Sequence, residues 1–178
     1  IDFIDPVLKT HLAEIRQQGI RVVTNAGGIN PHGAANALRQ IAREQGIDLK
    51  VSVVDGDNLM PLLDELRRAD IREMTQNTRL PKNVLAMNAY LGAFPIAAAL
   101  DAGTDVVITG RVVDSALMLA PCIHEFGWDT TELDKLAQGS LAGHLLECGT
   151  QSTGGLLTDW ESVESWVNVG FPIAEISI

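Results

Sequence analysis

The sequence contains little cysteine, few aromatic residues and little positive charge. Its 178 residues include only two cysteines, Cys122 and Cys148, with no C-x-x-C spacing. Two thiols in this arrangement favour neither a disulfide scaffold nor a zinc site. Aromatic residues make up 4% of the chain, so we expect a core built mainly from Ala, Val, Ile and Leu. A core of that kind suits helices packed against a sheet.

The scarcity of positive charge excludes some partners. The formal net charge is −10, from 13 Lys and Arg against 23 Asp and Glu. Binding to nucleic acid needs clustered Lys and Arg, so we expect no nucleic-acid partner and no anionic membrane surface. A phosphorylated small ligand needs only local donors and stays open. No apolar run reaches the roughly 18 residues that a membrane-spanning helix requires. We expect a cytoplasmic location.

The rest of the composition is ordinary for a globular protein. Hydrophobic residues make up 46% and charged residues 20% of the chain, which are typical values. The length fits one domain, residues 1–178, and a unit of this size buries about 70% of the surface of its extended chain. The chain starts at Ile1 and ends in a strand-like run, residues 173–178, with no closing element. We therefore expect an incomplete segment of a larger domain.

Short β-branched runs alternate with helical patterns along the chain. Strands are predicted at residues 20–24, 50–54, 84–87 and 105–109. Asp5, Asn30 and Asp114 are expected to cap helices. Helices are predicted at residues 6–18, 31–45, 59–68, 94–102, 114–126, 131–137 and 140–149, with a loop or weak helix at 70–82.

This βα series predicts an open, mostly parallel α/β sheet with helices on both faces. The layering would be Rossmann-like or flavodoxin-like, because the strands are too few for a barrel. Ligands of such sheets bind beyond the carboxyl ends of the strands. Those ends are predicted at residues 25–28, 55–57, 88–90 and 110–114.

Candidate binding residues follow the first, third and fourth strands. Asn25, Gly27, Gly28 and Asn30 lie in a glycine-rich loop that could present backbone N–H groups to an anion at a helix N-terminus. The loop matches neither the dinucleotide fingerprint nor the P-loop pattern, and a tight βα turn is the alternative. Asn88 follows the third strand and is a further candidate for substrate binding.

Arg111 comes directly after the fourth predicted strand. Its planar guanidinium is suited to hold a carboxylate or a phosphate, and Asp114 lies in the same loop. An ion pair of Arg111 with Asp114 or Asp105 is the alternative interpretation. We predict that Arg111 and Asp114 contribute to substrate binding.

Two regions carry candidate proton-transfer groups. Asp55 and Asp57 could serve a metal, a ribose hydroxyl or proton transfer, or could simply cap a helix. On the last predicted helix, His144 shares a face with Cys148. Together with Glu147 they could form a Cys–His nucleophile pair or a His–Glu acid–base pair.

The alternative for that helix is a buried thiol beside a satisfied histidine, on a face shared with Leu141 and Leu145. We predict catalytic roles for His144, Asp55, Asp57 and Glu147. No His is paired with Cys or Asp at a convincing metal spacing, so no metal site is predicted. The sequence specifies no cofactor.

Several longer motifs occur in one order along the chain. They are Arg21-Val-Val-Thr-Asn-Ala-Gly-Gly-Ile-Asn-Pro31, Asn88-Ala-Tyr-Leu-Gly-Ala-Phe-Pro-Ile96, Ala102-Gly-Thr-Asp-Val-Val-Ile-Thr-Gly-Arg111, His124-Glu-Phe-Gly-Trp128, Leu141-Ala-Gly-His-Leu-Leu-Glu-Cys-Gly149, Thr153-Gly-Gly155 and Gly170-Phe-Pro-Ile-Ala-Glu175. With these motifs the sequence resembles the acyclic terpene utilisation (AtuA-like) family over nearly its whole length.

The resemblance implies a metabolic setting. The family is associated with bacterial catabolism of acyclic terpenes such as citronellol and geraniol, which proceeds through acyl-CoA thioesters and a geranyl-CoA carboxylase. The chain would then be an N-terminal domain fragment of a longer protein. We expect an enzyme of terpenoid or branched-chain acid breakdown that acts on an acyl-CoA or a small carboxylate, and that forms a homo-oligomer. The alternative is a non-catalytic partner of carboxylase subunits, with Phe94 and Trp160 as interface residues.

Overall fold

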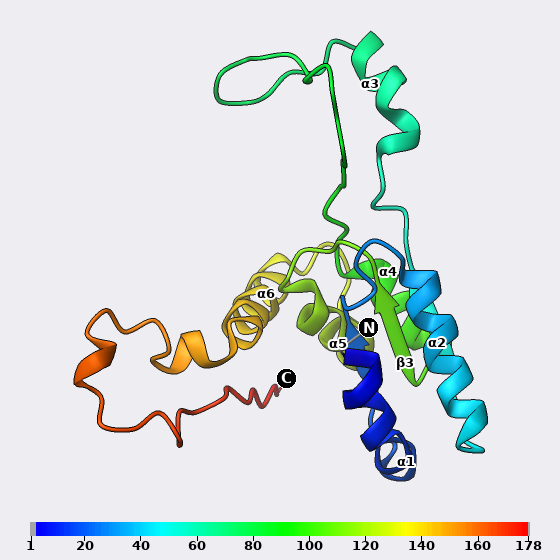
Figure 1. Cartoon of the computed structure of the whole chain (residues 1–178), viewed down its shortest axis with the longest axis vertical. Coiled ribbons are helices and arrows are strands. Elements are labelled where there is room, and N and C mark those ends of the chain that lie inside the picture. Colours follow the sequence, from blue (N-terminus) through cyan, green and yellow to red (C-terminus); the bar gives the residue numbers. More distant parts are fainter. Residues whose placement is uncertain (1–2, 178) are drawn as a thin grey trace.

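The computed structural model describes residues 3–177 and is built around a three-stranded parallel sheet (Figure 1). The middle strand is β3, and every residue of β3 is buried, as expected for a strand covered on both faces. The prediction of an open, parallel α/β sheet is confirmed. The strands, in the spatial order β1-β3-β2, are β1 (Val22–Thr24), β3 (Val106–Thr109) and β2 (Val51–Val54).

Helices cover both faces of the sheet. Successive side chains of β3 point to opposite faces, so each helical layer packs against a different set of them. Val106 and Ile108 pack on one face with η1 (Phe3–Leu8), α1 (Lys9–Gln18) and α2 (Pro31–Glu44). Val107 packs on the other face with α4 (Phe94–Asp101) and α5 (Ala116–Phe126). A further helix, α6 (Leu133–Glu147), packs against α5.

Local sequence signals set several helix ends. The side-chain oxygen of Asn30 accepts a hydrogen bond from the backbone N–H of Gly33 at 2.8 Å, so Asn30 caps α2 as predicted. α1 ends at Gly19 in the left-handed conformation. Asp114 does not cap α5: the helix begins one residue beyond Ser115, which makes no side-chain capping bond.

The predicted strand at residues 84–87 is wrong. This run forms no ladder with β1, β3 or β2, although the order β1-β3-β2 leaves the outer edges of β1 and β2 without a strand neighbour among the described residues. Leu85 is 97% exposed. Isolated β-bridges join the region that follows to its neighbours, from Asn88 to Asn58 and from Leu91 to Val112. The loop after the predicted strand nevertheless reaches the edge of the sheet.

The two helices predicted at residues 131–137 and 140–149 are one helix, α6, which begins after Glu132. Gly139 does not interrupt it, because the glycine is buried where α6 packs against Leu119 and Trp128. A Cβ at Gly139 would lie 2.8 Å from a methyl carbon of Leu119 and 2.9 Å from the ring of Trp128. The glycine therefore allows close helix packing.

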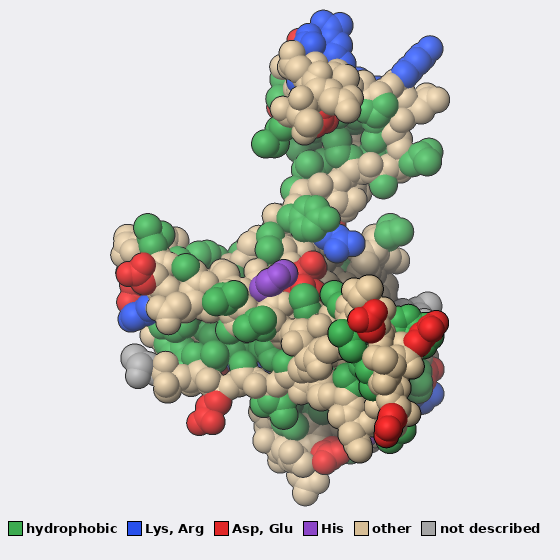
Figure 2. Space-filling model, turned by 90° about the vertical axis from the view of Figure 1, so that its left-hand side faces the viewer, with side chains coloured by type: hydrophobic (Ala, Val, Ile, Leu, Met, Phe, Trp, Pro, Cys, Tyr) green, Lys and Arg blue, Asp and Glu red, His purple; other side chains and the backbone are tan. Residues whose placement is uncertain are grey.

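Residues 59–87 form a projecting arm that rises from the strand ends and returns to them (Figure 1). Its ascending side carries η2 (Met60–Leu62) and α3 (Leu63–Arg68), in place of the single helix predicted at 59–68. In the loop predicted at 70–82, Asp70 pairs with Arg72 at 2.7 Å and with Arg79 at 2.9 Å. Figure 2 shows Lys and Arg side chains gathered at the tip of the arm.

The C-terminal segment, residues 148–177, wraps away from α6 and returns toward the body (Figure 1). It contains two short helices, η3 (Gly149–Thr153) and η4 (Trp160–Ser162). The strand predicted at 173–178 is absent from residues 173–177, and Ile178 lies outside the described residues. No strand of the described sheet runs beside this stretch, although Ile176 packs partly on the core.

Candidate functional site

A pocket of about 660 Å³ lies at the carboxyl ends of the parallel strands, beneath the base of the arm. Seven of the residues predicted to bind substrate or transfer protons line it. They are Asn25, Gly28, Asn30, Asp55, Asp57, Asn88 and Arg111. The pocket is where a parallel α/β sheet is expected to bind ligands. Four other candidates, Gly27, Asp114, His144 and Glu147, are not among the residues that line it.

Asp57 connects three of the loops around the pocket. Its side chain is buried, and its Oδ2 accepts hydrogen bonds from the side chain of Asn88 at 2.7 Å and from the backbone N–H of Arg111 at 3.0 Å. A Cβ at Gly110 would lie 2.3 Å from the other carboxylate oxygen. The carboxylate therefore holds the loop after β3 and the segment at Asn88 in place.

The side chain of Arg111 lies over the ring of Tyr90, with its guanidinium carbon 5.4 Å from the ring centroid. Among residues 3–177, no carboxylate forms an ion pair with this guanidinium. The expected alternative partner Asp105 lies 3.9 Å from Arg16 instead. Arg111 therefore presents its charge at the pocket wall, where an anionic ligand can reach it.

His32 and Asp55 form a hydrogen-bonded pair at the same pocket. The imidazole Nε2 lies 2.6 Å from Asp55 Oδ2, and both side chains are more than half exposed. A carboxylate oxygen accepts hydrogen bonds, so Nε2 of His32 donates in this pair. This arrangement orients a histidine for proton transfer. Sequence reasoning missed His32, because its pairing with Asp55 exists only in three dimensions.

The glycine-rich loop after β1 is a structured turn. The N–H of Gly28 donates to the carbonyl of Asn25 at 3.2 Å, and the N–H of Asn30 donates to the carbonyl of Gly27 at 3.0 Å. Gly27 packs against β3, where a Cβ would lie 2.4 Å from the carbonyl oxygen of Thr109. The tight βα turn is thus present, and it places Asn25, Gly28 and Asn30 at the pocket.

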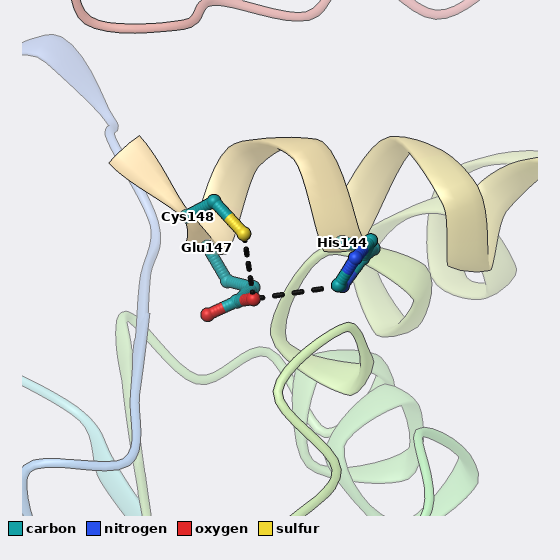
Figure 3. Close-up of side chains that lie close together, drawn as sticks. All are labelled: His144, Glu147 and Cys148. Carbon is teal, nitrogen blue, oxygen red and sulfur yellow. Dashed lines mark hydrogen bonds and ion pairs between the residues drawn. The ribbon is translucent and has the colours of Figure 1, made fainter. Parts of the chain in front are cut away.

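His144, Glu147 and Cys148 form a second cluster at the end of α6 (Figure 3). The thiol of Cys148 donates to Glu147 Oε1 at 3.1 Å, and His144 Nδ1 lies 3.6 Å from the same oxygen. The face is exposed and not buried as in the alternative interpretation, since Leu141 and Leu145 are 60% and 51% exposed. Because α6 lies on α5 and not on the sheet, this face finds no core to cover it.

The surroundings of Cys148 disfavour its thiolate form. The hydrogen bond to Glu147 raises the pKa of Cys148, with smaller contributions from desolvation and from the negative charges of Glu147 and Asp114. Asp114, from the loop after β3, therefore lies near this cluster. A thiolate is the nucleophilic form of cysteine, so a Cys–His nucleophile pair is not favoured here.

The surroundings of Cys122, His124 and His11 indicate structural roles. Cys122 is buried in the core, and burial raises the pKa of its thiol. His124 contacts Asp101 and Arg21, at the opposite end of the sheet from the pocket. His11 lies 3.8 Å from Glu14 on α1.

The fold and the pocket define the class of protein: an α/β protein with a polar site at the carboxyl ends of parallel strands. The sequence model described as acyclic terpene utilisation family protein AtuA matches residues 2–178, and the chain belongs to this family. A search of curated proteins and a search of solved structures returned no match. Within residues 3–177, no helix combines the length and apolarity needed to cross a membrane.

Proposed function

We propose that the strand-end pocket binds a small carboxylate or its acyl-CoA thioester, as a substrate in the breakdown of acyclic terpenoid or branched-chain acids. The observation that carries this proposal is the convergence of Arg111, His32 and Asp55 on one pocket. Family membership supports a catabolic role in acyclic terpene utilisation. The pocket supplies the residues with which that role would be performed.

Arg111 would bind the anionic group of the ligand. Its backbone is fixed by Asp57 and its guanidinium rests on Tyr90, so little side-chain freedom is lost when an anion binds. A guanidinium can donate two parallel hydrogen bonds to a carboxylate or a phosphate. Asn25, Asn30 and Asn88 line the same pocket and add neutral polar groups.

His32 would transfer protons, with Asp55 as the group that orients it. The two side chains come from the helix after β1 and the loop after β2, so the sheet brings them together from distant parts of the chain. Asp57, which was predicted to transfer protons, makes two hydrogen bonds to its neighbours. We infer that Asp57 is a positioning residue.

A thermal-shift titration of the full-length protein tests this proposal. The panel is CoA, geranyl-CoA, a branched acyl-CoA and the matching free acids. A ligand at 100 times its dissociation constant adds about 2.7 kcal/mol of native-state stability. We expect a shift that is lost in Arg111→Ala and kept in Arg43→Ala, a control on the exposed surface of α2. The absence of any shift across the panel would contradict the proposal.

A second candidate function is a non-catalytic partner of an acyl-CoA carboxylase. It is favoured by large apolar side chains that are exposed on the arm and on the C-terminal segment. Met74 and Ile173, for example, are 98% and 94% exposed. Trp160 is also exposed, and Phe94 partly so. The test is purification of a complex with carboxylase subunits. A stable complex that Trp160→Ala weakens, with the turnover of the carboxylase unchanged, would support this role over the first.

A further inference from the structure

We propose that the end of α6 binds a divalent transition-metal ion of the zinc class through His144 Nδ1, Glu147 Oε1 and Cys148 Sγ. The three side chains come from one helical turn, and their ligand atoms all lie within 4.8 Å of one another. Figure 3 shows the imidazole and the thiol converging on the carboxylate of Glu147. The site is separate from the strand-end pocket and does not depend on the function proposed for that pocket.

Two of the three spacings between the ligand atoms are close to those of a coordinated set, and the third lies within 4.8 Å. In a tetrahedral zinc site, with bonds of about 2.0 Å to nitrogen or oxygen and 2.3 Å to sulfur, neighbouring ligand atoms lie about 3.3–3.8 Å apart. Glu147 Oε1 lies 3.1 Å from Cys148 Sγ and 3.6 Å from His144 Nδ1. Small side-chain rotations on a fixed helix are therefore enough to place an ion between them.

The donor types indicate which ion fits. Imidazole and thiolate are ligands of zinc and its neighbours, whereas magnesium and calcium take oxygen ligands. Three protein ligands leave a fourth tetrahedral position open for water or another molecule. The exposure of His144, at 69%, gives an ion a path from solvent.

Negative charge in excess at this place supports a cation. Asp114 lies in the loop that leads into α5, where the last turn of α6 packs through Gly143 against Ser115, and no Lys or Arg pairs with Glu147 or Asp114 within residues 3–177. Binding would displace the Sγ proton to solvent, and Cys148 would bind as the thiolate.

The packing of α6 explains how Asp114 and Cys148 come together. Gly143 lies against the start of α5, where a Cβ would be 2.5 Å from the carbonyl oxygen of Ser115. This contact fixes the last turn of α6 beside the loop that contains Asp114. The linear spacing H-x-x-E-C does not match a familiar zinc motif, which is why sequence analysis predicted no metal site. The proximity of the three ligand atoms, which the linear spacing does not show, is what indicates the site.

Titration of the full-length protein with Co²⁺ tests the proposal. A cobalt–thiolate bond gives a charge-transfer band in the near ultraviolet. We expect one such site per chain, and competition of Zn²⁺ for it. Loss of a direct ligand should weaken affinity at least as much as loss of an outer-shell partner, which is about 10–100-fold. The test variants are Cys148→Ser and His144→Ala.

Two control variants match them. Cys122→Ala removes the other thiol, and His11→Ala removes a histidine that also lies three residues before a glutamate on a helix. Both should keep the band. As a readout that needs no variant, Zn²⁺ should slow alkylation of Cys148 and leave alkylation of Cys122 unchanged. A band that persists in Cys148→Ser, or Zn²⁺ without effect on Cys148 alkylation, would overturn the proposal.

Discussion

At the scale of single residues, the pocket depends on one buried carboxylate. Asp57 accepts hydrogen bonds from a side chain and a backbone N–H that come from two other loops. A buried polar group that loses its partner keeps the cost of its desolvation. The geometry of Arg111 therefore depends on Asp57 as well as on its own loop.

Asp57→Ala is expected to lower the free energy of unfolding by about 1–3 kcal/mol, because it leaves two part-buried donors without their partner. Urea denaturation of the full-length protein measures this change. The control is Asp48→Ala, at an exposed position, which should leave the midpoint of unfolding unchanged. Equal midpoints for the two variants would show that Asp57 does not hold the loops together.

Sequence reasoning found most of the polar side chains that line the pocket and missed His32. Asn25, Asp55, Asn88 and Arg111 each follow a predicted strand or a segment that reaches the strand ends, and strand ends converge in a parallel sheet. His32 lies inside a helix, where a polar side chain is usually exposed without a role. Only the three-dimensional pairing with Asp55 indicates a function for it.

At the scale of elements, α6 shows how glycine permits close helix packing. Gly139 and Gly143 are four residues apart and therefore lie on one face, and both are buried. Local propensity predicts a break at Gly139 because glycine lowers helix stability by about 1 kcal/mol. The close contacts with Leu119, Trp128 and Ser115 are tertiary, so no local pattern could have predicted a single continuous helix.

Gly143→Ala should therefore destabilise the protein, although the same change in a free helix would stabilise it. We expect a loss of about 1–3 kcal/mol, as for other overpacked positions, measured by chemical denaturation. Gln138→Ala, at an exposed position of the same helix, serves as the control and should be neutral or slightly stabilising. A more stable Gly143→Ala variant would contradict the packing of α6 on α5.

The arm is a second element whose order depends on charged contacts. The hydrogen bond from Arg72 lowers the pKa of Asp70, with further contributions from the charges of Arg72 and Arg79. Because the pKa in the folded state is lowered, the pairing is present above the ordinary pKa of an aspartate and is lost as the pH falls through the lowered value. Screening by salt weakens it as well.

Asp70→Asn is expected to loosen the tip of the arm. Asn tolerates the positive φ of 51° at this position, so the change removes charge and preserves the backbone. Limited trypsin digestion near pH 8 should then cleave faster after Arg72 and Arg79 in the variant, while cleavage after Arg43 in α2 provides the internal control. Unchanged rates after Arg72 and Arg79 would show that the Asp70 pairs do not order the tip.

The sheet was predicted better than its surroundings. β-branched runs and the caps at Asn30 and Gly19 are local signals, and they placed three strands and most helices. The run at residues 84–87 has the composition of a strand, but it lies in the arm, where Leu85 is exposed and no strand of the described sheet pairs with it. Whether a segment reaches a free sheet edge depends on the tertiary path of the chain and is not encoded in any single segment.

At the scale of the whole molecule, the distribution of charge bears on which ligand can bind. The chain carries a net charge of −10, yet the pocket presents an arginine without a carboxylate partner among the described residues, and the arm gathers further basic side chains above it. In an acidic protein, such a place is where an anionic ligand is most favoured. The central claim is therefore that Arg111 makes the strand-end pocket an anion site.

Calorimetric titration of geranyl-CoA, or of the panel ligand with the largest thermal shift, into the full-length protein tests this claim most directly. Hydrogen bonds to charged groups contribute about 1.5–3 kcal/mol, so Arg111→Ala should bind about 10–150-fold more weakly than the unmodified protein. Arg43→Ala should bind with unchanged affinity. Equal affinities for Arg111→Ala and the unmodified protein would contradict the account.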